Sequence, residues 1–317
     1  MWSACHNLLV NRARLLTIDT ASLYYRAFFG LPSSMRAPDG RAVNAVRGLL
    51  DFITRLVGDY SPTHLVCAWD EDWRPQWRVE LIPSYKRHRL AGPDATAEDS
   101  PEELSAQVHM IREVLAALGV PVIGAPGYEA DDVLASLAAS FPGEVYVATG
   151  DRDLFQLVTG RVSVVYVGRG VARHDLVTPE WVENAYGIPA CRYVDFAVLR
   201  GDPSDGLPGV RGIGDKTAAA LIRAHGGLDG ILAAATDPAS GMAAGVRAKL
   251  LAGRDYLAPA RRVVTAVPDL DLGEVPGWDP AMMDTGRLDE LSADLGLGRS
   301  AVRVRSALAG QRSDRST

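Results

Sequence analysis

The sequence predicts an α/β fold with a mostly parallel central sheet, followed by a second domain made of helices. Two observations predict the sheet: short apolar runs alternate with segments whose apolar residues recur at helical spacing, and acidic residues stand where several of the runs end. A third predicts the helical domain, because strand-like runs cease after about residue 175 while helical patterns continue. In parallel sheets the functional crevice lies beyond the carboxyl ends of the strands, so these acids are the first candidates for a site.

Five apolar runs are predicted as strands. The first ends at Asp19, the second at Asp70 and the fourth at Asp151, so the topology would bring three carboxylates to one edge of the sheet. In chain order the runs are RLLTIDTA, THLVCAWD, PVIG, EVYVATGD and RVSVVYVG.

Helices are predicted between these strands. The clearest is SPEELSAQVHMIREVLAALG, where Ser100 is a good N-cap, Pro101 fits the first turn and Glu103 completes a capping box before Gly119 ends the helix. The other predicted helices of the first half are AVNAVRGLLDFITRLVGDY, EADDVLASLAASF and the short RDLFQLV.

The second half is predicted to be helical. Thr178 caps the segment TPEWVENAYG, with Pro179 in its first turn. A Gly-rich stretch, GDPSDGLPGVRGIGDK, leads into the helix TAAALIRAHGG. The remaining helical segments are PACRYVDFAVLRGD and AAGVRAKLLAGRDYLAPARRVVTAV, the second of which contains Pro259.

The composition is that of an ordinary globular protein of 317 residues, 47% hydrophobic and 23% charged. No stretch approaches the roughly 18 apolar residues of a membrane helix, and the first residues lack a signal-peptide pattern. We therefore expect a cytoplasmic protein with no membrane partner. The scattered cysteines Cys5, Cys67 and Cys191 lack zinc-binding spacing, and their odd number argues against a disulfide framework.

Nine carboxylates stand out as a candidate metal site. Gathered without counter-ions they would repel one another, and some would take up protons. Mg²⁺ resolves this by binding carboxylates, waters and phosphate oxygens, and two such ions roughly 3.5–4 Å apart form the two-metal site of phosphoryl transfer. Setting the nine acids aside changes the net charge from −6 to +3, so the rest of the chain leans basic. The nine are Asp19, Asp70, Glu129, Asp131, Asp132, Asp151, Asp153, Asp202 and Asp205.

A simpler role stays open for each acid taken alone. Asp at a strand end often caps a helix or lies in a loop, and either Asp131 or Asp132 would stabilise a helix N-terminus through its dipole. The joint occurrence of acids at successive strand ends favours the metal site.

Six strings resemble the bacterial 5′–3′ exonuclease/flap endonuclease family, which includes the 5′-nuclease domain of bacterial DNA polymerase I. They run in family order over roughly residues 15–225, and the chain resembles a free-standing member. The strings are LLTIDTASLYYRAFFGLP, AWD, WRVELIPSYKRHR, GYEADDVLASLA, TGDRDLFQLV and GDPSDGLPGVRGIGDKTAAALI. The resemblance implies a PIN-like (resolvase-like) nuclease domain at residues 1–175 with a helical arch at about 73–100, an all-helical helix-three-turn-helix DNA-binding domain at 176–300 with a helix–hairpin–helix-like motif, and a flexible tail at 301–317.

The resemblance also assigns the acids to two metal sites. Asp19, Asp70, Glu129, Asp131, Asp132 and Asp151 match the tighter site, and Asp153, Asp202 and Asp205 match the looser one. The implied cofactors are two or more Mg²⁺ or Mn²⁺ ions. The usual family string SDNIPG reads SDGLPG here, so Gly206 replaces an asparagine, a departure that concerns local turn geometry.

Basic residues are the expected partners of these acids. By the resemblance, Lys86 and Arg89 in the arch contact the scissile phosphate, while Arg26 and Arg78 lie near the 5′ strand. Fixed cations there would stabilise the charge that develops in the transition state. Tyr85 is expected to stack on an unpaired base. A solvated basic loop is the alternative for YKRHR.

The string GVRGIGDKTA resembles a helix–hairpin–helix turn that binds duplex DNA. Its glycines let backbone N–H groups approach phosphates, and the following helix presents an N-terminus that favours anions. The implied DNA contacts are Arg211, Gly212, Gly214, Lys216 and Thr217, with K⁺ held by the backbone of Val210 and Ile213. Arg223, Arg247 and Lys249 are expected to add nonspecific phosphate contacts or to be exposed solubilising charges. A plain turn is the alternative for the Gly-rich loop.

The implied function is a structure-specific 5′ nuclease, a 5′-flap endonuclease and 5′–3′ exonuclease of DNA and RNA primers in replication and repair. Expected partners are DNA with a 5′ flap, nick or 5′ end and RNA–DNA primer junctions, and the expected state is a nucleoid-associated monomer. Two alternatives stay open: a noncatalytic protein that binds DNA structures, and a PIN-domain ribonuclease. The full acid set with Lys86 disfavours the first, and GVRGIGDKTA disfavours the second.

Overall fold

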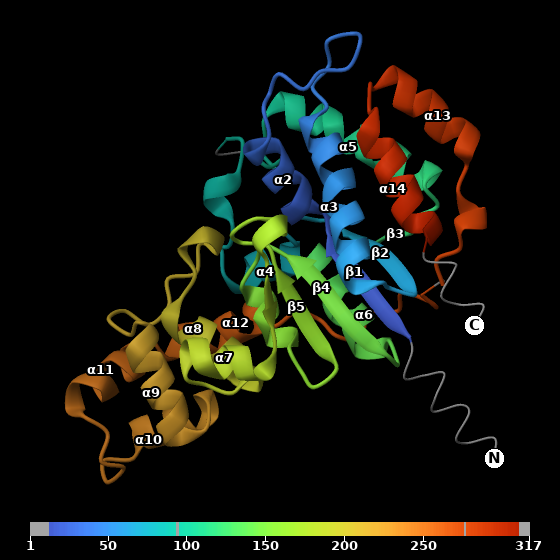
Figure 1. Ribbon diagram of the computed structural model, residues 1–317. Helices are drawn as coiled ribbons and strands as arrows, with labels where there is room; N and C mark the ends of the chain where they lie inside the picture. Colours follow the sequence, from blue (N-terminus) through green and yellow to red (C-terminus); the bar gives the residue numbers. More distant parts are fainter. Residues whose placement is uncertain (1–12, 93–94, 276, 311–317) are drawn as a thin grey trace, which may run out of the picture.

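The computed structural model describes residues 13–92, 95–275 and 277–310. Within these ranges six strands form one sheet in the order β3-β2-β1-β4-β5-β6 (Figure 1). Neighbouring strands are parallel, except that β6 runs antiparallel to β5. The strands are β1 (Arg14–Asp19), β2 (His64–Trp69), β3 (Val122–Gly124), β4 (Glu144–Thr149), β5 (Val162–Tyr166) and β6 (Asp175–Val177). The predicted α/β fold with a mostly parallel sheet is confirmed.

Apolar side chains on both faces of the central strands bury the sheet. In β1, Leu15 packs into one core while Leu16 and Ile18 pack into the other, and all three are fully buried. Such continuous apolar strands are typical of parallel sheets that helices cover on both sides. The carboxyl ends of β2, β1 and β4 therefore lie side by side at one edge of the sheet.

Helices cover the two faces. On one face pack α2, α3, α5, α13 and α14, and on the other pack α6 and the helical domain. The helices are α2 (Thr20–Gly30), α3 (Asn44–Tyr60), α4 (Gln76–Leu81), α5 (Glu102–Ala117), α6 (Ala130–Ser140), α7 (Pro179–Tyr186), α8 (Tyr193–Arg200), α9 (Asp215–His225), α10 (Leu228–Thr236), α11 (Ala244–Ala252), α12 (Arg254–Val264), α13 (Thr285–Asp294) and α14 (Arg299–Gly310).

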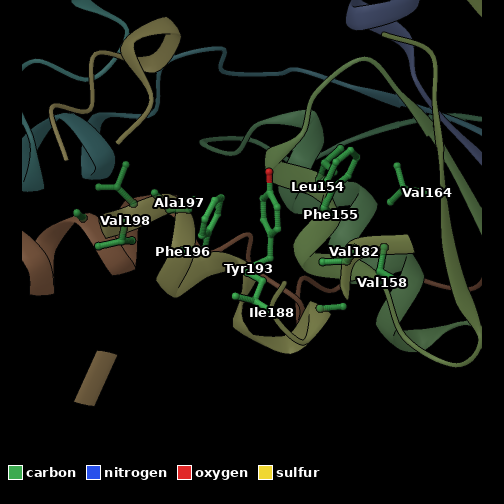
Figure 2. Close-up of a cluster of buried hydrophobic side chains, with 14 of the residues drawn as sticks. Leu154, Phe155, Val158, Val164, Val182, Ile188, Tyr193, Phe196, Ala197 and Val198 are labelled. Carbon is green, nitrogen blue, oxygen red and sulfur yellow. The ribbon is translucent and has the colours of Figure 1, made fainter. Parts of the chain in front are cut away.

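The helical domain shares a core with the sheet rather than hanging from a linker. Phe155, in a short 3₁₀ helix (Asp153–Leu157) after β4, meets Tyr193 of α8 with ring centroids 5.4 Å apart, and Phe196 continues the row (Figure 2). Tyr193 and Phe196 are fully buried. This packing fixes the loop that follows α8, which carries Asp202 and Asp205, relative to the strand ends.

The C-terminal helices return to the face of the sheet that α3 and α5 cover. α14 packs against α3 and α13 packs against α5, on the side away from α8–α12 (Figure 1). The prediction of a flexible tail from residue 301 is therefore wrong for residues 301–310. Ala301, Val304 and Leu308 recur at helical spacing and are buried in the core above α3. Residues 311–317 lie outside the described residues.

Several local predictions also change. α5 begins at Glu102 without a side-chain cap, because Ser100 accepts a hydrogen bond from Tyr25 instead and Glu103 pairs with Arg36. The sequence patterns missed β6 and the helices α2, α4, α10 and α13. Thr178 caps α7 as predicted, accepting from the backbone N–H of Trp181. No helix of the described ranges is both long and apolar enough to cross a membrane.

Candidate metal and nucleic-acid site

A cavity of about 460 Å³ opens at the carboxyl ends of β1, β2 and β4. The strand order reverses between β1 and β4, which is where parallel α/β sheets form their ligand crevice. Six predicted metal ligands and two predicted cations line this cavity. The eight are Asp19, Asp70, Lys86, Arg89, Glu129, Asp131, Asp151 and Asp202.

The strand-end acids are each fixed by hydrogen bonds. Asp19, the last residue of β1, caps α2 by accepting from the backbone N–H of Ser22 (3.0 Å), and its other oxygen accepts from the Thr149 hydroxyl (2.7 Å). Asp70, directly after β2, accepts from the backbone N–H of Ala130 at the start of α6 (2.8 Å). These bonds leave the remaining carboxylate lone pairs free for a ligand in the cavity.

Burial and mutual repulsion raise the pKa values of three acids of the cavity. Burial, together with the charges of Asp70 and Asp151, raises the pKa of Asp19 from 3.8 to about 7. Burial and the nearby Glu129 raise the pKa of Asp70 to about 6. Burial, Asp151 and Asp19 hold the pKa of Asp131 well above its ordinary value. A cation placed among these groups would favour their ionised forms.

The second group of acids adjoins the first. Asp153 and Asp205 line a smaller hollow beside the cavity, and Asp131 lines both. Asp153 is 8% exposed, and its Oδ1 is buried without a hydrogen-bond partner among the described residues. Burial and the charge of Asp151 hold its pKa well above the ordinary value. Asp205 is buried, which raises its pKa to about 6.

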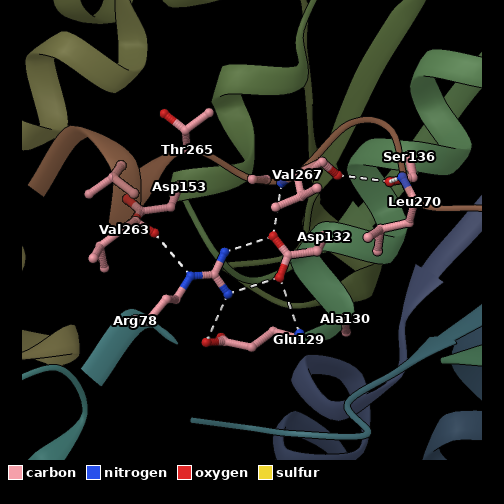
Figure 3. Close-up of polar contacts among 12 residues, drawn as sticks. Arg78, Glu129, Ala130, Asp132, Ser136, Asp153, Val263, Thr265, Val267 and Leu270 are labelled. Atoms are coloured by element: carbon pink, nitrogen blue, oxygen red, sulfur yellow. Dashed lines mark hydrogen bonds and ion pairs between the residues drawn. The ribbon is translucent and has the colours of Figure 1, made fainter. Parts of the chain in front are cut away.

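Two of the nine acids form ion pairs with a buried arginine. Arg78 donates to both oxygens of Asp132 (2.9 and 2.7 Å) and lies 3.0 Å from Glu129 (Figure 3). Asp132 is fully buried and also accepts from the backbone N–H groups of Val267 (2.9 Å) and Glu129 (3.2 Å). This arrangement corrects two predictions: Asp132 does not face the cavity as a ligand, and Arg78, 2% exposed, does not face a DNA strand.

Tyr85 and Lys86 are buried against Glu129. The Tyr85 hydroxyl donates to both Glu129 oxygens (2.8 and 3.1 Å), and the residue is only 4% exposed, which corrects the prediction that it stacks on an unpaired base. The Lys86 ammonium pairs with Glu129 and donates to the carbonyl of Trp73 (3.4 Å). Lys86 nevertheless lines the cavity, so a phosphate there would compete with Glu129 for its ammonium group.

The other predicted cations differ in position. Arg89 donates to Asp205 Oδ1 (2.7 Å) and the Ser204 carbonyl (2.8 Å) at the cavity rim. Arg26, on α2, has a buried Nε without a hydrogen-bond partner in the described chain and is not among the cavity-lining residues.

The predicted duplex-binding turn lies just ahead of α9. Arg211, Gly214 and Lys216 are exposed, and Gly212 has a positive φ of 79°. Val210 and Ile213 are buried, and the Val210 carbonyl accepts from the Ile213 N–H (2.9 Å). Thr217 is partly buried in the first turn of α9.

Three further basic residues of the helical domain contact backbone carbonyl groups. The Lys249 ammonium donates to the Gly212 carbonyl (3.0 Å), so a lysine already occupies one of the turn's oxygens. Arg223 donates to the Gly187 carbonyl and Arg247 to the Asp237 carbonyl, although both contacts are exposed.

The donor set fits hard divalent cations. It consists of carboxylate oxygens, with an orphaned buried oxygen on Asp153 and raised pKa values around it. Among the described residues no three Asp, Glu, His or Cys side chains converge closely enough to hold one ion between them.

Sequence reasoning missed residues that shape the cavity. Tyr25 donates to Glu98 (3.0 Å), and both line the cavity with Trp73 and Ser204. Glu98 carries no local signal because its partner lies 73 residues away. Thr149 is the first residue of the string TGDRD, and its hydroxyl donates to the strand-end acid Asp19.

Two family models match the chain. The family model described as 5′-3′ exonuclease, N-terminal resolvase-like domain, matches residues 14–187, and the one described as 5′-3′ exonuclease, C-terminal SAM fold, matches residues 188–279.

Two relatives match over nearly their whole length. A 5′-3′ exonuclease of Streptomyces coelicolor is 50% identical over 301 residues, covering 92% of this chain and 99% of the relative. A 5′-3′ exonuclease of Mycobacterium tuberculosis is 47% identical over 312 residues, covering 94% and 98%. The crystal structure of the bacteriophage T5 D15 flap endonuclease with DNA and metal ions is similar in fold, with a TM-score of 0.61, 20% identity and coverage of 93% of this chain and 99% of that one.

Proposed function

The chain belongs to the 5′-3′ exonuclease family, and we propose that it is a metal-dependent nuclease that cleaves phosphodiesters at 5′ ends and 5′ flaps of DNA and of RNA primers. One observation carries the proposal: acids from three adjacent strand ends and from α6 open into one cavity with Lys86 and Arg89 on its wall. Metal-dependent cleavage of a phosphate diester uses both features: cations of the protein bind the phosphate oxygens, and a set of acids holds the metal ions.

Two groups of acids would hold the ions. Asp19, Asp70, Asp131 and Asp151 form the group nearest the sheet, and Asp153, Asp202 and Asp205 form the second. Mg²⁺ or Mn²⁺ held there would acidify an attacking water and offset charge on the scissile phosphate and leaving oxygen.

The chain's own residues position the substrate. Lys86 and Arg89 bind the oxygens of the scissile phosphate, each exchanging a carboxylate partner for the phosphate. Glu129 holds Lys86 in the cavity before substrate arrives, and Arg78 with Asp132 holds Glu129 in turn. Asp132, Arg78 and Tyr85 therefore act on the reaction only through Glu129 and Lys86.

The helical domain binds the duplex beside the cleavage site. Backbone N–H groups of the turn before α9 and the exposed Arg211 and Lys216 contact phosphates without reading sequence. K⁺ bound by the carbonyls of Val210 and Ile213 would add positive charge to this turn. We further propose that the protein works as a monomer on nicked, flapped and primer-junction DNA in the nucleoid.

A labelled 5′-flap duplex tests this function. We expect cleavage with Mg²⁺ or Mn²⁺, none with EDTA, and none of a single-stranded RNA control. Asp131→Asn should lower turnover strongly while duplex affinity stays near that of the unaltered protein. The exposed Asp289→Asn on α13 is the matched control. Binding of the flap without cleavage under either metal would instead indicate a noncatalytic DNA-binding protein, and cleavage of the RNA alone would indicate a ribonuclease.

A further inference from the structure

We propose that Gln156 is a positioning residue of the second group of acids, because its side-chain amide ties the backbone of Asp153 to the segment that follows α12. We call residues 263–270 the strap. The metal-binding role of Asp153 rests on the nuclease function proposed above, whereas the tie itself does not. Loss of the tie should weaken the binding of divalent metal and leave the affinity for DNA unchanged.

The backbone of Asp153 is held on both sides by side chains. Its N–H donates to Asp151 Oδ1 (2.8 Å), and its carbonyl accepts from Gln156 Nε2 (2.8 Å). Asp153 opens a 3₁₀ helix of five residues, and such short helices have poorer internal hydrogen-bond geometry than α-helices. Bonds from outside the helix backbone therefore help to determine where the Asp153 carboxylate lies.

The Gln156 amide also reaches the strap at two backbone groups. Its Nε2 donates to the Val264 carbonyl (3.0 Å), and its Oε1 accepts from the Ala266 N–H (2.9 Å). Both N–H groups of the amide and its oxygen are used by these bonds together with the bond to Asp153, so the side chain is fixed in one orientation. One glutamine thus links a predicted metal ligand to residues 108 and 110 positions further along the chain.

The strap is itself held in place by side chains of α6 and α4. The Ser136 hydroxyl donates to the Val267 carbonyl (2.8 Å) and accepts from the Leu270 N–H (3.1 Å). Figure 3 shows these contacts beside the bonds that Arg78 and Asp132 make to the strap. The strap therefore offers the glutamine amide a fixed anchor.

The strap also closes one side of the second acid group. Val263, Val264 and Ala266 are buried and line the small hollow that Asp153 and Gln156 line as well. Asp153 Oδ1 has no hydrogen-bond partner among the described residues, so backbone contacts rather than a bond to this oxygen determine where it lies. Without the tie, the acid would lose one of the two contacts that hold its backbone.

Gln156→Met is the test variant, because methionine fills similar space but cannot make these amide hydrogen bonds. Gln107→Met is the matched control. The Gln107 amide, on α5, likewise accepts from a backbone N–H, that of Ala45 (2.8 Å), and donates to a backbone carbonyl, that of Glu103 (3.2 Å), but it lines neither acid-bearing hollow. Both variants should therefore lower the urea midpoint, and only one should alter metal binding.

Mn²⁺ binding, followed by the electron paramagnetic resonance of the free ion, is the main readout. We expect the weaker Mn²⁺ binding of the unaltered protein to weaken by about a further ten- to a hundredfold in Gln156→Met, as is typical when a group that orients a metal ligand is removed. Duplex affinity in EDTA should stay unchanged, and cleavage of a flap should need more Mg²⁺ to reach half its maximal rate. The control should change none of these quantities.

The outcomes separate a failure of this inference from a failure of the proposed function. Equal Mn²⁺ binding by Gln156→Met and the unaltered protein overturns the positioning role, and so does an equal weakening in Gln156→Met and Gln107→Met. If the unaltered protein binds Mn²⁺ but cleaves no DNA, the proposed function fails while the Mn²⁺ comparison still decides the role of Gln156. If it binds no Mn²⁺, both fail. Should Gln156→Met not fold, Ser136→Ala removes two bonds that hold the strap and must weaken Mn²⁺ binding in the same direction.

Discussion

Replacing Arg78 with methionine should cost the protein much of its stability. The Arg78 guanidinium, 2% exposed, makes two hydrogen bonds to Asp132, lies 3.0 Å from Glu129 and donates to the Val263 carbonyl (3.1 Å). Methionine fills similar space but supplies no charge and no donor. Glu129 would retain Lys86 and Tyr85, whereas Asp132 would be left buried with only two backbone N–H donors.

The magnitude follows from that unpaired carboxylate. Removing one partner of a buried ion pair typically costs about 3–5 kcal/mol, a large share of the roughly 5–15 kcal/mol that stabilises a folded protein. Exchanging both partners for apolar residues removes the uncompensated charge, so the double variant Arg78→Met/Asp132→Leu should recover much of the loss. Arg55→Met, which breaks the exposed Arg55–Asp59 pair, should cost no more than about 1 kcal/mol.

Urea unfolding at pH 7.5, followed by circular dichroism, measures all of these variants. The midpoint should fall strongly for Arg78→Met, partly recover in the double variant and hardly move for Arg55→Met. A midpoint for Arg78→Met like that of the unaltered protein, accompanied by weaker DNA binding, would refute the buried-pair argument and restore the earlier assignment of Arg78 to the DNA strand.

Three further predictions concern the acids, Lys86 and α14. Without divalent metal, stability should fall as pH rises from about 4 to about 7, because the raised pKa values of Asp19 (about 7) and Asp70 (about 6) mean that the folded protein holds protons that the unfolded chain has released. Melting temperatures measured in EDTA across this pH range check the prediction, and a flat profile would contradict it. Mg²⁺ should stabilise the protein more at pH 7.5 than at pH 5. Lys86→Met should lower turnover on a flap far more than it lowers duplex affinity, and equal losses in the two assays would count against its phosphate contact. Deleting residues 299–310 should cost about 3–6 kcal/mol from the burial of Val304 and Leu308 alone, and an unchanged urea midpoint would show that α14 does not stabilise the fold.

The positions of the strand-end acids could be predicted because a sequence pattern and a rule of sheet topology together determine where they lie. Apolar runs mark buried strands, and parallel strands bring their carboxyl ends to one edge. Asp19, Asp70 and Asp151 follow three such runs, and they line one cavity. The order of the strands did not have to be known, since any parallel arrangement places these ends on the same side of the sheet.

The buried cations could not be predicted in the same way. Arg78 and Asp132 lie 54 residues apart, and no local pattern distinguishes an arginine that pairs inside the protein from one that faces DNA. The string YKRHR looks like an exposed basic loop, yet Tyr85 and Lys86 are buried because Glu129 offers both of them a charged partner. Tertiary partners decide burial for such amphipathic side chains.

The C-terminal helix shows a different limit of sequence reasoning. RSAVRVRSALAG carries three arginines, which give it the polar character of a tail. Its apolar stripe was nevertheless present at helical spacing, and Arg303 pairs with Asp51 of α3 (2.7 Å) instead of facing solvent alone. A test for spacing within this segment, rather than for composition, would have found the helix.

The nine acids divide into two classes that explain how they are held so close together. Four have a cation of the protein within ion-pair distance: Glu129, Asp132, Asp202 and Asp205. The other five, Asp19, Asp70, Asp131, Asp151 and Asp153, have none within the described ranges. Burial, together with neighbouring carboxylates, raises the pKa of Asp19, Asp131 and Asp153.

This division assigns different work to the two classes. The paired acids hold Lys86, Arg78 and Arg89 in place, so replacing one of them should disturb the position of a cation before it disturbs metal binding. The unpaired acids carry up to five negative charges, which two divalent ions would nearly offset. Metal should therefore stabilise the fold through the unpaired acids, and promote cleavage only where the paired acids have already placed the cations. For this reason loss of the unpaired Asp131 and loss of the paired Glu129 should differ in their effect on metal affinity, even if both abolish turnover.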